Sequence, residues 1–137
     1  MENIMSHIAS NIVIACVDFR FQNEFLAQCN KQLGNKTFDY LTYPGASKAI
    51  LDRKSRDAIF FAISTLVKIH QTEMVVILDH IDCGAYGGSV RFSNIKDEIN
   101  FHKEKLTEAG ELLTKEFPEI KVGLLIYNYR QNKLLTV

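Results

Sequence analysis

The sequence contains no tryptophan, only two prolines and only three cysteines among its 137 residues. The cysteines Cys16, Cys29 and Cys83 are odd in number and form no CxxC pair. A disulfide framework of the kind that holds small secreted proteins together is therefore not expected. We expect the reducing cytoplasm instead, where thiols stay free to bind a metal.

Net charge and long apolar runs are also lacking. Sixteen basic residues balance sixteen acidic ones, so the chain has no general electrostatic attraction to nucleic acid or to an anionic membrane, and we expect neither as a partner. No apolar run approaches the ~20 residues that cross a bilayer. Residues 1–19 carry Glu2 and no lysine or arginine, which argues against a signal peptide.

Hydrophobic residues make up 47% of the chain, enough for the core of a single domain over residues 1–137. Short apolar runs rich in β-branched residues alternate with longer helical patterns. The runs predict strands over 11–17, 37–43, 73–78 and 120–127 and a short edge strand over 133–137; the patterns predict helices over 21–33, 55–70 and 94–117. Residues 55–70 are apolar nearly all round, which predicts a buried helix, with Asp52 or Ser55 as its cap.

This alternation predicts an α/β fold: a mostly parallel central sheet of four strands plus a short edge strand, with helices on both faces. In open sheets of this kind, ligands bind beyond the carboxyl ends of the strands. The residues that follow the first and third predicted strands are therefore the candidates for chemistry.

Two short motifs stand at these strand ends, "CVDFR" (16–20) and "HIDCG" (80–84). If the two strands are neighbours, Cys16, His80 and Cys83 converge on one point. Thiolates and imidazole are the ligands that zinc prefers, and three protein ligands leave a fourth position open, as in catalytic zinc sites. The pattern predicts a zinc site.

Alternation along an extended segment places Asp18 and Arg20 on the same side as Cys16. Asp18 could accept a hydrogen bond from a water on the metal, while Arg20 holds the carboxylate ionised. Asp18 could instead move onto the metal and close the site. Gly84 permits a tight turn, and a helix starting there would stabilise the Cys83 thiolate.

The paired motifs resemble those of the β-class carbonic anhydrases, C-x-D-x-R followed by H-x-x-C-G, and the resemblance covers residues 10–128. It implies zinc held by Cys16, His80 and Cys83, and a catalytic dyad of Asp18 and Arg20. It also implies a lyase that reversibly hydrates carbon dioxide to bicarbonate by a hydroxide on zinc. A homodimer or higher homo-oligomer is implied too, because subunits share the pocket in that family.

The chain departs from the family after the second strand, where an Arg-Asn-Ala-Gly-like run usually shapes the pocket. The matching stretch is "TYPGASKA" (42–49), of which only Gly45 and Ala46 echo the run. We expect these two residues and Gly84 to bind substrate. The chain also has almost nothing before its first strand, where many members carry helices that clasp the partner.

Other functions stay open at this point. The altered 42–49 loop could admit carbonyl sulfide or carbon disulfide as the substrate of a hydrolase, or the protein could bind zinc without turnover. A different chemistry would use Cys83 as a nucleophile with His80 as its base. By residue type alone, His7, His70 and His102 are candidate proton relays, although His102 falls on an apolar helical stripe.

Overall fold

The computed structural model describes residues 5–137, so Glu2 lies outside the described part of the chain. Four strands run parallel and a fifth is antiparallel at the edge, in the order β2-β1-β3-β4-β5. The strands are β1 (Asn11–Cys16), β2 (Phe38–Tyr43), β3 (Met74–His80), β4 (Lys121–Asn128) and β5 (Lys133–Thr136). The predicted α/β class is confirmed, and the first and third strands are neighbours, which is the condition for their ends to meet.

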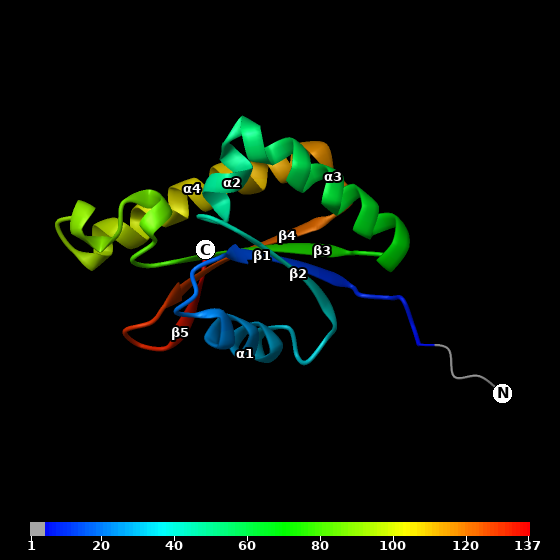
Figure 1. Ribbon diagram of the computed structural model, residues 1–137, viewed down its shortest axis with the longest axis horizontal. Coiled ribbons are helices and arrows are strands. Elements are labelled where there is room, and N and C mark those ends of the chain that lie inside the picture. The colour runs from blue at the N-terminus through cyan, green and yellow to red at the C-terminus, as the bar shows by residue number, and fades with distance from the viewer. Residues whose placement is uncertain (1–4) are drawn as a thin grey trace.

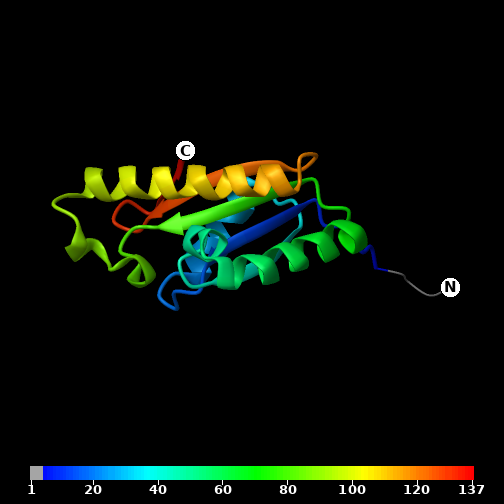
Figure 2. The same cartoon turned by 90° about the horizontal axis from the view of Figure 1, so that it is seen from above.

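The helices cover both faces of the sheet, as predicted (Figure 1). Helix α1 (Gln22–Gln32) lies against one face, and α2 (Ser47–Leu51), α3 (Arg53–His70) and α4 (Ile95–Glu116) lie against the other. Figure 2 shows α3 and α4 running lengthwise along the sheet. Helix α2 and two short 3-10 helices, η1 (Gly84–Tyr86) and η2 (Ser89–Arg91), were not predicted.

Side-chain oxygens fix the beginnings of the two long helices. Asp52 accepts a hydrogen bond from the Lys54 N–H at the start of α3, and Asn94 accepts one from the Asp97 N–H at the start of α4. Asp52 is therefore the cap of α3. No described helix combines the length and apolarity needed to cross a membrane.

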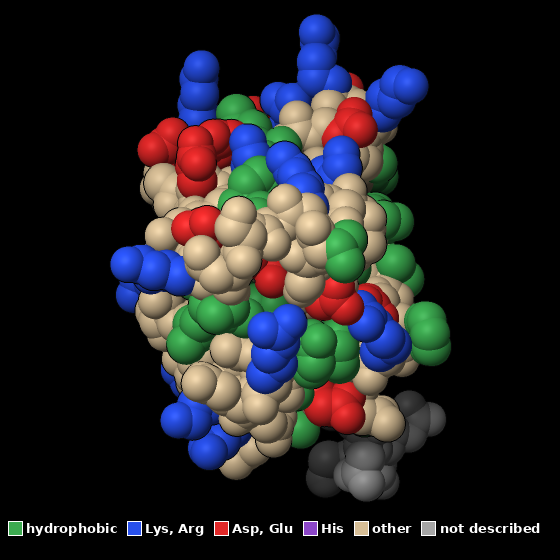
Figure 3. Space-filling model, turned by 90° about the vertical axis from the view of Figure 1, so that its left-hand side faces the viewer, with side chains coloured by type: hydrophobic (Ala, Val, Ile, Leu, Met, Phe, Trp, Pro, Cys, Tyr) green, Lys and Arg blue, Asp and Glu red, His purple; other side chains and the backbone are tan. Residues whose placement is uncertain are grey.

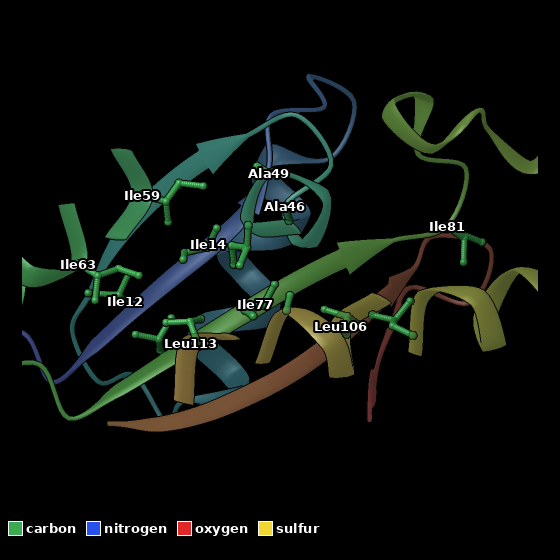
Figure 4. Packing of buried hydrophobic residues seen from close by; sticks show 14 residues of the cluster. Ile12, Ile14, Ala46, Ala49, Ile59, Ile63, Ile77, Ile81, Leu106 and Leu113 are labelled. Carbon is green, nitrogen blue, oxygen red and sulfur yellow. The ribbon is translucent and has the colours of Figure 1, made fainter. Parts of the chain in front are cut away.

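Alternation along the buried strands divides the core into two clusters. Ile12, Ile14 and Ile77 pack against the α2–α4 side, together with residues such as Ile63 and Leu113 (Figure 4). On the α1 side, Val13, Val76 and Leu78 pack with Phe25 and Cys29. Since successive side chains of a strand point to opposite faces, the last two residues of β3, Asp79 and His80, are directed into different layers.

The predicted helix over residues 55–70 is present, but the prediction that it is a buried helix is wrong. Only Ile59 and Ile63 of α3 are fully buried, while Phe61 is 76% exposed and Ile69 is 55% exposed. A single helix packed on one face of a sheet buries one stripe of side chains. Its remaining apolar residues face outward.

Candidate metal centre

The two motifs meet at the carboxyl edge of the sheet. Cys16 ends β1 and His80 ends β3, and these strands pair directly. The Cys16 and Cys83 sulfurs lie 3.9 Å apart. One potential ligand atom from each of Cys16, His80 and Cys83 lies within 4.8 Å of the others, and all three residues are buried. The convergence expected from the sequence is therefore present.

The His80 ring is fixed in one orientation. Its Nδ1–H donates a hydrogen bond of 2.7 Å to the Ile81 carbonyl, and the rings of Phe21 and Phe25 pack against it at 5.4 and 5.6 Å. Nε2 is therefore the unprotonated nitrogen of the neutral ring. It is fully buried and has no hydrogen-bond partner among the described residues. A buried polar atom left without a partner is unfavourable, and a metal ion at this position would satisfy it.

The donor set fits zinc in spacing as well as in chemistry. Two sulfurs bound at 2.3 Å in a tetrahedral arrangement lie about 3.8 Å from each other, close to the 3.9 Å between Cys16 and Cys83. All three cysteines are free thiols. The arrangement of two sulfurs and one imidazole nitrogen can hold one ion with a fourth position left over.

The two thiols and the imidazole are coupled electrostatically. Hydrogen bonding to Cys83 lowers the pKa of Cys16, and the same contact raises the pKa of Cys83, because the pair readily loses one proton and retains the second. Burial alone would lower the pKa of His80, but the adjacent Cys16 sulfur raises it on balance. The backbone N–H groups of Ala85 and Tyr86 act in the opposite sense on Cys83, lowering its pKa, as expected for a turn that begins at Gly84.

Asp18 and Arg20 form a close ion pair beside these ligands. The Arg20 Nη2 donates to Asp18 Oδ2 at 2.7 Å, Arg20 Nε contacts both carboxylate oxygens, and the Arg20 backbone N–H donates to Oδ1 at 2.9 Å. The guanidinium holds the pKa of Asp18 below its usual range. Asp18 Oδ2 lies 3.7 Å from His80 Nε2. The carboxylate thus stands at the ligand cluster while both its oxygens are engaged by Arg20.

A second carboxylate, Asp82, also holds Arg20, which the sequence did not indicate. Arg20 Nη1 donates to Asp82 Oδ2 at 3.0 Å, and Nη2 donates to the Asp82 carbonyl at 2.9 Å. Asp82 adopts a left-handed conformation with φ 60° and is fixed in turn by Ser89 and by the buried carboxylate of Glu98. Arg20 therefore joins the loop after β1 to the loop after β3.

A pocket of about 600 Å³ opens next to Cys16. Its wall is apolar at Val17, Phe19, Pro44 and Ala85, and polar at the Asp18–Arg20 pair. Figure 3, which faces the carboxyl ends of the strands, shows hydrophobic side chains interleaved with acidic and basic ones on this side. The arrangement places a small, largely apolar space next to a carboxylate and a set of potential metal ligands.

Comparison with known proteins shows the family to which the chain belongs. A family model described as "Putative carbonic anhydrase" matches residues 6–134, nearly the whole chain. The chain belongs to this carbonic anhydrase family. An uncharacterized protein of Rickettsia bellii is 36% identical over 121 residues, which cover 83% of this chain and 73% of that protein. An uncharacterized protein of Rickettsia conorii is 35% identical, over 83% of this chain and 64% of that protein.

Solved structures share the fold of this family member. A carbonic anhydrase of Streptococcus mutans superposes with a TM-score of 0.63 at 15% identity, covering all of this chain and 87% of that one. A β-carbonic anhydrase of Aspergillus fumigatus gives 0.62 at 20% identity, over 94% and 75% of the two chains. Tetrameric β-carbonic anhydrases of Sordaria macrospora give 0.59 at 12% identity, over 94% and 80%. The chain is a divergent member with the β-class fold.

The 42–49 loop, where this carbonic anhydrase relative departs from the β-class pattern, contacts the ligand cluster through its backbone. The Gly45 N–H donates to the Cys16 sulfur at 3.4 Å. Gly45 has φ 81°, and a Cβ there would lie 2.7 Å from the Lys48 Cβ, so glycine is required. Ala46 is fully buried, whereas Pro44 and Gly84 line the pocket. Of the three residues expected to bind substrate, Gly84 lines the pocket, Gly45 donates a hydrogen bond to the Cys16 sulfur, and Ala46 is buried.

The three histidines considered as proton relays lie away from the pocket. His102 is fully buried and hydrogen-bonds Asp79 on the other face of the sheet. His70, the last residue of α3, pairs with Asp39 at 2.7 Å, and its carbonyl accepts from the Ala9 N–H before the start of β1. His7 also precedes β1. Among the described residues, those that line the pocket include no histidine that could carry a proton from the ligand cluster to solvent.

Proposed function

We propose that this protein is a zinc-dependent carbonic anhydrase that interconverts carbon dioxide and bicarbonate. The observation that carries the proposal is the cluster of Cys16, Cys83 and His80, whose buried Nε2 has no partner among the described residues. Zinc held by these three residues would supply Lewis-acid activation of a water molecule near neutral pH. Membership of the carbonic anhydrase family supports the same reaction.

The chain's own residues have distinct roles in this proposal. Asp18 accepts a hydrogen bond from the reacting water and orients it. Arg20 keeps Asp18 ionised, and because Arg20 is itself held by Asp82, it restrains Asp18 from moving onto the ligand cluster. The apolar wall at Phe19 and Pro44 accommodates carbon dioxide, which has no net dipole and little affinity for polar groups.

The direct test combines metal analysis with a stopped-flow assay of carbon dioxide hydration. We expect about one zinc per chain, and hydration activity that a chelator removes and added zinc restores. One zinc per chain with no hydration across pH 6–9 would contradict the proposal and favour a zinc-binding protein without turnover. Sulfide release from carbonyl sulfide or carbon disulfide, faster than carbon dioxide hydration, would contradict it in favour of a hydrolase.

The proposal places the protein in the cytoplasm as one zinc-binding domain. Both sulfur ligands need to stay reduced, and they lie close enough that oxidation would compete with metal binding. A nucleophilic Cys83 is the weaker alternative. Cys83 is 2% exposed, its sulfur lies 3.9 Å from that of Cys16, and it is not among the residues that line the pocket.

We further propose that the protein forms a homodimer or higher homo-oligomer through the edge where the pocket opens. Phe19, in the pocket wall, is 88% exposed, and Val90, two residues from the pocket residue Gly88, is 97% exposed. Exposed apolar side chains of this kind are common in interfaces. We expect light scattering at micromolar concentration to give at least twice the monomer mass, and Phe19→Ser with Val90→Ser to shift it towards the monomer. A monomeric wild-type protein would exclude this assembly.

A further inference from the structure

A second buried polar cluster lies chiefly in the α2–α4 layer of the core, and it reaches the layer of Cys16 and Cys83 through one tyrosine, Tyr86. It consists of Ser47 at the start of α2, Asp79 near the end of β3, Tyr86 in η1 and His102 in α4. Ser47 and His102 are fully buried, Asp79 is 1% exposed and Tyr86 is 8% exposed. Four polar side chains this deep in a core layer need a reason, because burying them is unfavourable unless each is paired.

The hydrogen bonds in this cluster have a definite direction. The Asp79 carboxylate accepts from the Ser47 N–H at 3.0 Å, from the Ser47 hydroxyl at 2.7 Å and from His102 Nδ1–H at 2.8 Å. Since the hydroxyl proton of Ser47 is directed at Asp79, the Tyr86 hydroxyl must donate to Ser47 Oγ, at 2.7 Å. Burial raises the pKa of Tyr86, so its hydroxyl keeps that proton.

This arrangement is not a nucleophilic triad. Ser47 and His102 both donate to Asp79 and make no hydrogen bond to each other, and neither is exposed to a substrate. The cluster therefore holds parts of the chain together and does not carry out a reaction.

Three of the segments that it joins carry or contact a proposed metal ligand. Asp79 immediately precedes His80 in β3. Ser47 begins the helix that follows the Gly45–Ala46 turn, and the Gly45 N–H contacts the Cys16 sulfur. The Tyr86 N–H donates to the Cys83 carbonyl at 3.1 Å, which closes the turn after that ligand.

We propose that Asp79, Ser47 and Tyr86 form a bracket that sets the positions of the three metal ligands. They are positioning residues, because none of them belongs to the ligand set or lines the pocket. The bracket rests on the proposed metal site, and it adds that the site's affinity depends on hydrogen bonds among side chains that do not line the pocket. His102 anchors the bracket to α4, and its ring lies edge-on to that of Tyr86 at 5.3 Å.

The Tyr86→Phe variant tests the bracket with the smallest change, since it deletes only the hydroxyl that joins η1 to Ser47. Loss of a group that supports a metal ligand typically weakens metal binding ~10–100-fold. We expect the lower end, about 10-fold in the Zn²⁺ dissociation constant, because one link of several is removed. We also expect a changed visible spectrum when Co²⁺ replaces zinc, since that spectrum reports ligand geometry directly.

Tyr127→Phe is the matched control. Tyr127 is also buried, at 2% exposure against 8% for Tyr86, and its hydroxyl donates at 2.8 Å to Asn132 in the β4–β5 turn, which carries no ligand. The Ser47→Ala variant removes the hydroxyl that accepts the hydrogen bond of Tyr86. We expect it to weaken metal binding by at least as much as Tyr86→Phe. The double variant should then bind metal no more weakly than Ser47→Ala alone, because both changes break the same hydrogen bond.

The outcomes separate the bracket from the metal site itself. If the wild-type protein bound neither Zn²⁺ nor Co²⁺, the proposed function would fail, whatever the variants did. If the wild type bound metal and Tyr86→Phe and Ser47→Ala bound it equally well with unchanged Co²⁺ spectra, the bracket alone would fail, even if both variants melted at lower temperature. Weakened binding in these variants, with Tyr127→Phe unaffected, supports the bracket.

Discussion

Replacing Cys83 with serine is expected to abolish tight zinc binding and carbon dioxide hydration together. Serine has nearly the shape of cysteine, but its hydroxyl does not ionise near neutral pH and is a poor ligand for zinc. Only Cys16 and His80 would remain as protein ligands. The dissociation constant for Zn²⁺ should therefore rise by more than the ~10–100-fold typical of losing a supporting outer group.

The measurement is metal content after dialysis, followed by stopped-flow hydration on the same samples. Cys29→Ser is the control. Cys29 is 1% exposed, lies in α1 among the core residues of that face, and has a pKa raised to about 11 by burial. Its replacement is expected to lower stability but to leave zinc and activity in place. Full activity in zinc-free Cys83→Ser protein would end the proposal that this cluster carries the reaction.

The convergence of the three candidate ligands could be predicted because each belongs to a local pattern. Cys16 follows a short β-branched run, and His80 and Cys83 follow another, so the carboxyl-end rule for parallel sheets placed all three at one edge. Whether β1 and β3 were neighbours could not be read from the runs themselves. Strand order is set by long-range packing of both faces, and the structure supplies it.

Residues that support the ligands from a distance left no such signal. Glu98 occupies the first turn of α4, where acidic residues are common on any helix. Only the tertiary structure shows that it accepts a hydrogen bond from the Asp82 N–H. His102 falls on an apolar helical stripe, and the sequence offers no partner for its ring nitrogens. It is fully buried because Asp79, far away in the sequence, provides its partner.

Helix α3 (53–70) shows that a sequence pattern can predict an element but not how much of it is buried. Its apolar composition predicts a helix correctly, but composition does not say how many neighbours a helix has. With one sheet face to pack on, α3 buries Ile59 and Ile63 and leaves Phe61 outside. The number of covered faces is a property of the whole fold.

Replacing Asp18 with asparagine is expected to lower the hydration rate while leaving zinc in place. The amide keeps the size of the carboxylate but has no negative charge, so it accepts a proton or a strong hydrogen bond from the reacting water far less well. Loss of a positioned acid–base group typically lowers a rate ~10²–10⁴-fold. Asp18 is not among the three ligand-supplying residues, so zinc content should stay at about one per chain.

Asp39→Asn is the matched control, since Asp39 also pairs closely with a basic side chain. Its partner is His70, at 2.7 Å, and β2 carries it far from the carboxyl edge where Asp18 stands. Stopped-flow kinetics with metal analysis should show unchanged kcat for this control. An unchanged kcat in zinc-loaded Asp18→Asn protein would remove Asp18 from the mechanism. A higher kcat together with altered zinc affinity would mean that Asp18 itself closes the site, and that Arg20 and Asp82 do not restrain it.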